Sequence, residues 1–145
     1  MEPSAKPLKI DFDMLQLALS DHSGVEWFLD RESGECLSLS PYEGVEEEAE
    51  IRVALEQRPD RFAFIVPLPS FYEKNLMAEF ADDIKPDELN AHLARALSGR
   101  HPFRAFKDVL LDYPEQREAW FQARDQGLRR AALEWLEENG IQPEL

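Results

Sequence analysis

The stretch VEWFLDRESGECLSLS, residues 25–40, decides the fold class of this chain. Its first half places Val25, Trp27 and Leu29 on one face of an extended segment, and its second half alternates two leucines with serines. A repeat of two residues is typical of a strand with one buried face. The RESGE segment between the two halves has the residues of a turn. The stretch therefore predicts a β-hairpin.

Helix and strand patterns continue on both sides of the hairpin. Residues 11–24 predict a helix with Asp11 as its N-cap, and residues 46–58 predict a second helix. Residues 61–69 predict a third strand. Its two prolines assign it to a strand end or a sheet edge, because proline cannot donate a hydrogen bond to a central ladder.

From residue 70 onward the pattern is helical. The segment SFYE predicts a capping box, with Ser70 as the N-cap and Glu73 at the third helical position. Further helices are predicted to begin at three prolines: Pro86, Pro102 and Pro114. Gly127 lies in the middle of the last helix, where it indicates a kink or a break.

The combined pattern predicts an α+β fold. A small antiparallel sheet, made of the hairpin and the third strand in the N-terminal half, is expected to pack against a helical C-terminal half. The 145 residues are 43% hydrophobic, enough for a real core. We predict a single domain over residues 1–145, with residues 1–10 flexible.

The charge of the chain is strongly negative and uneven. There are 30 acidic and 16 basic residues, a formal net charge of −14, and residues 1–50 hold 13 acids against 3 bases. Such a field repels nucleic acids and anionic membranes, so neither is an expected partner. It attracts a basic protein surface, although the same charge also serves solubility alone.

Cysteine usage and apolar runs indicate the compartment. Cys36 is the only cysteine and cannot form an internal disulfide, so a reducing cytoplasm is expected. The longest apolar runs are too short to span a bilayer, and the first ten residues lack the apolar core of a signal peptide.

Catalytic motifs are missing from the sequence. It contains no glycine-rich phosphate loop and no G-x-S-x-G elbow. His22, His92 and His101 do not have metal-ligand spacing, and Cys36 has no histidine signature near it. We therefore predict no catalytic residue, no metal and no cofactor.

One segment runs against the acidic composition. Residues 91–107 contain no acid but four cations, of which Arg100, Arg104 and Lys107 lie around the start of a predicted helix. Together with His101 they form a candidate anion-binding site, because backbone N–H groups and cations meet at that helix end. The alternative is internal ion pairing, for example of Arg104 with Asp108 at i+4.

Aromatic residues near the C-terminus suggest a second candidate surface. The spacing places Phe121 on the core face of the last helix and offsets Trp120 by one position, toward solvent. Trp120 with Arg117 and Arg124 then has the spacing for a cation–π stack. The alternative is an amphipathic residue at the edge of the core.

The C-terminal half resembles a known family. The residues that carry the likeness are Gly99, Phe103, Arg104, Phe106, Lys107, Asp108, Trp120, Phe121, Trp135 and Leu136. They resemble the signature of the bacterial Uncharacterised Protein Family number zero-one-five-eight, and the likeness spans residues 25–141. This resemblance implies a soluble bacterial protein and no particular activity.

Two classes of function stay open. The first is a non-catalytic binding or regulatory module that uses the acidic half to bind a basic protein. The second is binding or turnover of a phosphate- or carboxylate-bearing small molecule at Arg100, Arg104 and Lys107. Self-association through an exposed Trp120, giving a homo-oligomer, is compatible with either.

Overall fold

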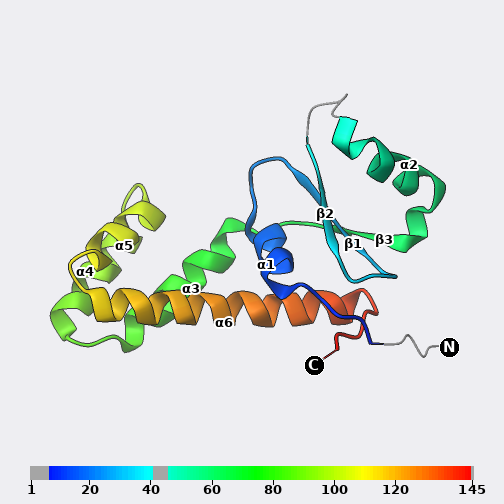
Figure 1. The fold of residues 1–145 in the computed structure, drawn as a ribbon. Helices are drawn as coiled ribbons and strands as arrows, with labels where there is room; N and C mark the ends of the chain where they lie inside the picture. The colour runs from blue at the N-terminus through cyan, green and yellow to red at the C-terminus, as the bar shows by residue number, and fades with distance from the viewer. Residues whose placement is uncertain (1–6, 41–45, 145) are drawn as a thin grey trace. The chain divides into compact units, whose positions relative to one another are not determined.

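The computed structural model describes residues 7–40 and 46–144. It confirms the α+β fold, with a three-stranded antiparallel sheet in the N-terminal half (Figure 1). The contacts divide the chain into two units: unit 1, which is Met1–Leu68 with Arg129–Leu145, and unit 2, which is Pro69–Leu128. The single domain over residues 1–145 stays a prediction. Residues 1–6 of the segment predicted to be flexible lie outside the described residues.

Unit 1 contains the sheet. The strands are β1 (Glu26–Asp30), β2 (Cys36–Leu39) and β3 (Phe62–Ile65), in the order β2-β1-β3. β1 pairs antiparallel with both neighbours, which confirms the predicted hairpin and the edge position of the third strand. The helices of this unit are α1 (Phe12–Ser20) and α2 (Ala49–Gln57), with the short 3₁₀ turns η1 (Glu46–Glu48) and η2 (Pro59–Arg61). Asp11 caps α1 as predicted, because its Oδ1 accepts a hydrogen bond from the Met14 backbone N–H at 3.1 Å.

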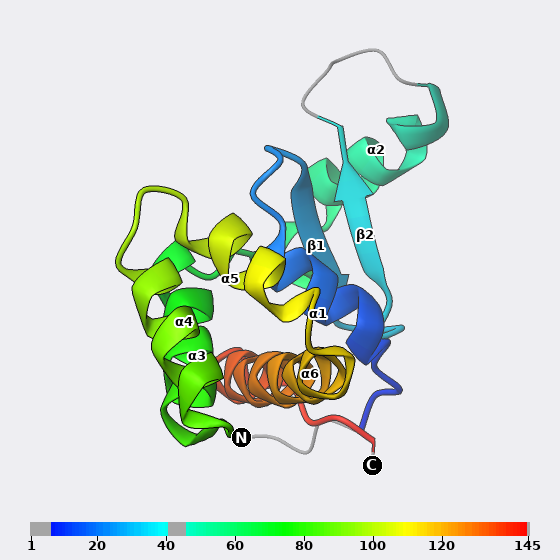
Figure 2. The same ribbon diagram turned by 90° about the vertical axis from the view of Figure 1, so that its left-hand side faces the viewer.

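Unit 2 is helical. Its helices are α3 (Ser70–Asp83), α4 (Asp87–Leu97), α5 (Pro102–Leu110) and the part of α6 (Pro114–Glu138) up to Leu128. Helix α4 lies beside both α3 and α5 (Figure 2). The buried core is apolar: Leu76, Met77, Ala81, Leu89, Leu93, Leu97, Phe106, Leu110 and Trp120. The α5 and α6 starts at Pro102 and Pro114 are as predicted.

The predicted capping box at the start of α3 is wrong. Pro69 is the N-cap, and no side chain makes a hydrogen bond at this cap. Pro69 already has the extended conformation that an N-cap requires, so Ser70 becomes the first helical residue. The Glu73 carboxylate instead accepts a hydrogen bond from Nε of Arg124 at 2.7 Å, which ties α3 to α6 within unit 2.

Gly127 serves packing and does not break α6, which is one helix from Pro114 to Glu138. A Cβ atom at this position would lie 2.6 Å from Cδ2 of Leu76. The Gly127 carbonyl also accepts a hydrogen bond from the Tyr72 hydroxyl at 2.8 Å. The glycine therefore lets α3 lie close to α6 without displacing the Leu76 side chain.

Candidate functional site

A hollow in unit 1 lies between the segment before α1 and the β1–β2 turn. It has a volume of about 480 Å³ and is open to solvent. Its lining comes from two short stretches, residues 9–13 and residues 33–35. We call it the acidic hollow, because Asp11, Asp13 and Glu35 all line it.

Gly34 fixes the geometry of the acidic hollow. Its φ of +81° lies in the left-handed region, which closes the turn with a hydrogen bond from its N–H to the Asp30 carbonyl at 2.8 Å. A Cβ atom here would lie 2.3 Å from the carbonyl oxygen of Lys9. Only glycine lets the backbone of the segment before α1 approach the turn this closely.

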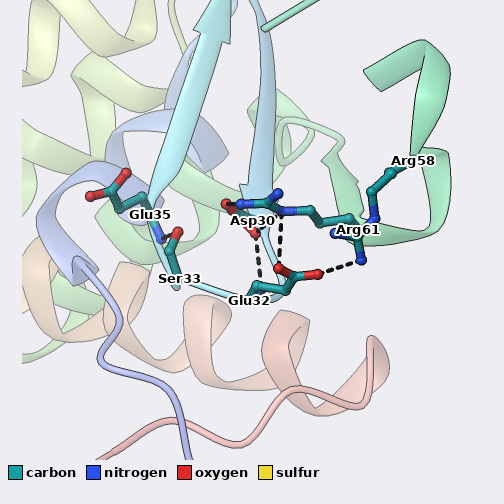
Figure 3. Close-up of polar contacts among 6 residues, drawn as sticks. All are labelled: Asp30, Glu32, Ser33, Glu35, Arg58 and Arg61. Atoms are coloured by element: carbon teal, nitrogen blue, oxygen red, sulfur yellow. Dashed lines mark hydrogen bonds and ion pairs between the residues drawn. The ribbon is translucent and has the colours of Figure 1, made fainter. Parts of the chain in front are cut away.

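A buried ion pair holds the other side of the turn (Figure 3). The Asp30 carboxylate accepts hydrogen bonds from Nε and Nη2 of Arg61 at 2.9 and 2.8 Å, and from the backbone N–H of Glu32 at 2.9 Å. Burial by itself raises the pKa of Asp30, but the Arg61 guanidinium, the Glu32 N–H and the Ser33 hydroxyl lower it more, to about 2. The Glu32 side chain also pairs with Arg58. The turn is therefore held to Arg58 and to Arg61 of η2, just before β3.

Asp13 and Glu35 are the exposed carboxylates of the acidic hollow that remain for a partner, since Asp11 caps α1. Within residues 7–40 and 46–144, Asp11, Asp13 and Glu35 form no ion pair. Phe12 also lines the hollow, and its ring carries the Arg129 guanidinium 3.7 Å from the centroid. Unit 1 as a whole holds 19 acidic and 8 basic residues, a net charge of −11, whereas unit 2 has 11 and 8.

The cationic residues predicted as an anion site lie around the start of α5 in unit 2. His101 is the N-cap residue of α5 without a side-chain cap hydrogen bond, and Arg100, Arg104 and Lys107 are exposed. None of these three cations has an ion-pair partner in the described part of the chain, so the predicted pair of Arg104 with Asp108 is absent.

Two cations of residues 91–107, Lys107 and Arg95, line different hollows. Lys107 lines a small notch together with Trp120, whereas Arg95 lines a different hollow beside His92 and Gly99. Two residues from the two predicted surfaces, Lys107 and Trp120, are thus brought together.

The prediction of an exposed Trp120 is wrong. Trp120 is 1% exposed, and its ring packs against those of Phe106 and Phe80 with centroids 5.1 and 5.6 Å apart. Phe121, predicted to lie in the core, is 43% exposed and carries the Arg117 guanidinium 5.0 Å from its ring centroid. Arg124 does not stack on Trp120 but bonds to Glu73, so an aromatic surface here is formed by Phe121.

The remaining chemistry does not favour a reactive centre. Burial, with a smaller contribution from Asp11, raises the pKa of the Cys36 thiol to about 11, so the thiol is protonated at neutral pH. Among the residues that the structure describes, no group of three His, Cys, Asp or Glu side chains is arranged to hold a metal ion. No helix in those same ranges has the length and apolarity needed to cross a membrane.

Sequence reasoning missed the acidic hollow. The turn residues of RESGE and the N-cap Asp11 were identified separately, but nothing in the local pattern brings them together. The one available signal was Gly34, whose position in a tight turn is compatible with a close backbone approach.

Comparison with known proteins assigns the chain to a family. A family model described as an uncharacterised protein family, UPF0158, matches residues 5–145. The protein named UPF0158 protein PA5073, from Pseudomonas aeruginosa, is 38% identical over 138 residues, which cover 95% of this chain and 88% of that protein. This α+β chain therefore belongs to the UPF0158 family, as the resemblance of its C-terminal half indicated. No solved structure matches it significantly.

Proposed function

We propose that the chain is a non-catalytic binding module whose unit 1 binds a basic segment of a partner protein. The observation that carries this proposal is the concentration of charge in unit 1, a net −11, around a hollow lined by Asp13 and Glu35, two exposed carboxylates without an ion pair among the described residues. The proposal locates the module in the bacterial cytoplasm, a setting that the single cysteine and the bacterial relative support.

The acidic hollow has the chemistry that a lysine or arginine side chain requires. Exposed carboxylates at Asp13 and Glu35 provide acceptors for its charged end, and the apolar surface of Ile10 and Phe12 suits its aliphatic stem. The Phe12 ring already carries a guanidinium of the chain itself, that of Arg129. The net charge of unit 1 adds long-range attraction and raises the association rate.

The test is a titration of the full chain with a fluorescent peptide rich in lysine and arginine, followed by anisotropy. We expect binding that weakens as salt increases, and a loss of at least several-fold in affinity for the double variant Asp13→Asn with Glu35→Gln. The matched control is Glu79→Gln with Glu118→Gln, which removes the same charge from exposed positions in unit 2.

Two results would count against this function. If the control variant loses as much affinity as the hollow variant, bulk charge and not the hollow binds the peptide. If the wild type binds the basic peptide no more tightly than an acidic peptide of the same length, the acidic unit serves solubility.

A second candidate function is the binding of a small anion at the start of α5. The observation that favours it is that Arg100, Arg104 and Lys107 are exposed and lack ion-pair partners in the described ranges. We expect inorganic phosphate or citrate to raise the melting temperature of the wild type, and the Arg104→Ala and Lys107→Ala variants to lose this increase. If neither anion raises the melting temperature of the wild type, this candidate is rejected.

A further inference from the structure

A small notch lies where α5 ends and α6 begins in unit 2. Of the residues in the two candidate sites described above, it includes only Lys107. Its volume is about 100 Å³. That is close to the liquid volume of three water molecules and well below the roughly 300 Å³ at which small-molecule pockets begin. The notch, which we call the Phe121 notch, therefore suits a single side chain of a partner rather than a cofactor or metabolite.

The buried part of the Phe121 notch lining is apolar. Leu110 and Trp120 belong to it and are each 1% exposed. Trp120 is held edge-on against Phe106 and Phe80 in the core of unit 2, so its position is fixed before any partner binds. Preorganised apolar pockets of this kind receive the anchoring side chains of protein interfaces.

Two apolar side chains that line the same notch are exposed to solvent. Leu111 is 61% exposed and Phe121 is 43% exposed. Phe71 is the other large hydrophobic side chain of unit 2 with comparable exposure, and it lies in α3, outside the notch lining. Apolar surface concentrated beside a preformed pocket is a mark of an interaction site.

The charges around the notch identify the partner. Lys107 and Arg117 both line it and are exposed, and neither forms an ion pair with any residue that the structure describes. Asp108 is the only acidic residue in the lining, so cations outnumber carboxylates there. This is the reverse of the chain as a whole, and a complementary partner carries carboxylates next to its apolar side chain.

We propose that the Phe121 notch docks an apolar side chain of an acidic peptide segment in a partner protein. The apolar side chain enters the notch beside Phe121 and Leu111, and carboxylates that flank it in the partner pair with Lys107 and Arg117. This proposal does not rest on the binding of a basic segment by unit 1, since the two surfaces use different residues and partners of opposite charge.

The first experiment is a selection of peptides by the full chain from a library of short random peptides displayed on phage. We expect the selected peptides to share one aliphatic or aromatic residue flanked by Asp or Glu. A selected peptide should shift the NMR signal of the Trp120 indole N–H, which lies in a buried side chain without a partner among the described residues. A consensus of basic peptides, or no consensus, overturns the proposal.

The second experiment uses variants and the best selected peptide. Phe121→Ser, and separately Lys107→Glu with Arg117→Glu, should each weaken binding at least tenfold. The controls are Phe71→Ser, an exposed aromatic in unit 2 outside the notch, and Lys74→Glu with Arg95→Glu, which reverses two exposed cations outside the notch. Equal losses in the controls, or no loss in the notch variants, overturn the proposal.

Sedimentation of the wild type and of Phe121→Ser tests the competing occupant, a second copy of this chain. A wild-type dimer that Phe121→Ser converts to a monomer overturns the proposal, because the notch is then a self-association surface. The charge-reversal variant keeps the test decisive if Phe121→Ser fails to fold, since exposed charges contribute little to folding.

Discussion

Replacing Asp30 by asparagine is expected to destabilise unit 1 to an extent that depends on pH. The Asp30 side chain is 7% exposed and its two oxygens accept from Nε and Nη2 of Arg61 at 2.9 and 2.8 Å. Asparagine supplies one acceptor and directs an NH₂ group at a guanidinium that can only donate. The variant Asp30→Asn therefore leaves a donor of Arg61 unsatisfied in a mostly buried position.

The magnitude follows from the pKa of Asp30. Burial acts to raise this pKa, and the hydrogen bonds from Arg61, Glu32 and Ser33 overcome burial and lower it from 3.8 to about 2. A difference of that size between the unfolded and folded states corresponds to about 2 kcal/mol of stability. Because the folded pKa is the lower one, this stability is present above the unfolded pKa and is lost as the pH falls toward 2. About half of it should be gone by roughly pH 3.

The assay is urea denaturation of the wild type and of Asp30→Asn from neutral pH downward. The other carboxylates contribute equally to the unfolding free energies of the two proteins, so the difference between these free energies reports on Asp30. We expect a difference of about 2 kcal/mol at neutral pH that narrows below about pH 4. Asp60→Asn is the matched control, since Asp60 is an exposed carboxylate of unit 1, and it should change stability by less than about 0.5 kcal/mol. A difference that is the same at low and neutral pH would refute the reasoning.

Three further outcomes follow from individual positions. Gly127→Ala should destabilise the chain by about 1–2 kcal/mol in urea denaturation, because its Cβ would meet Cδ2 of Leu76 at 2.6 Å. In a Leu76→Ala background the same change should stabilise α6 by up to about 1 kcal/mol, the helix propensity gain. Gly34→Ala should lower stability by at least about 2 kcal/mol, measured the same way, because φ is +81° and the Lys9 carbonyl blocks the Cβ. Alkylation of Cys36 by iodoacetamide should be slow at neutral pH and accelerate only toward pH 11 in the folded chain, whereas urea should restore the reactivity of a free thiol.

The hairpin of unit 1 could be predicted because its determinants are local. Alternation along residues 25–40 and a turn in the middle predict both strands. They do not predict the register, which pairs Leu29 with Cys36 and Phe28 with Leu37. The helix starts at Pro102 and Pro114 were predictable for the same reason, since proline acts on its own backbone.

The inner face of α6 in unit 2 could not be predicted, because residues far along the chain decide it. Trp120 and Phe121 are neighbours of similar hydrophobicity, and helical spacing alone selected Phe121 for the core. The structure selects Trp120, because its ring fits between Phe80 of α3 and Phe106 of α5. A sequence pattern does not contain that contact.

The acidic hollow escaped prediction for a related reason. It exists because Gly34 meets the Lys9 carbonyl, a contact between two segments with a helix and a strand between them in the sequence. The local sequence pattern assigns Asp11 and Asp13 to the start of a helix and Glu35 to a turn. Their common position follows only from the tertiary approach that the glycine allows.

The two proposed surfaces are linked by charge even though they share no residue. A basic segment bound to unit 1 lowers the negative charge of the chain, and this weakens the repulsion that an acidic segment meets on its way to the Phe121 notch. Linkage makes the effect reciprocal, so each partner raises the affinity of the other by the same factor. Since salt screens the attraction and repulsion between exposed charges, this coupling weakens as salt is added. Positive coupling that persists in high salt therefore requires direct contact between the partners or a change of conformation, because charge alone does not supply it.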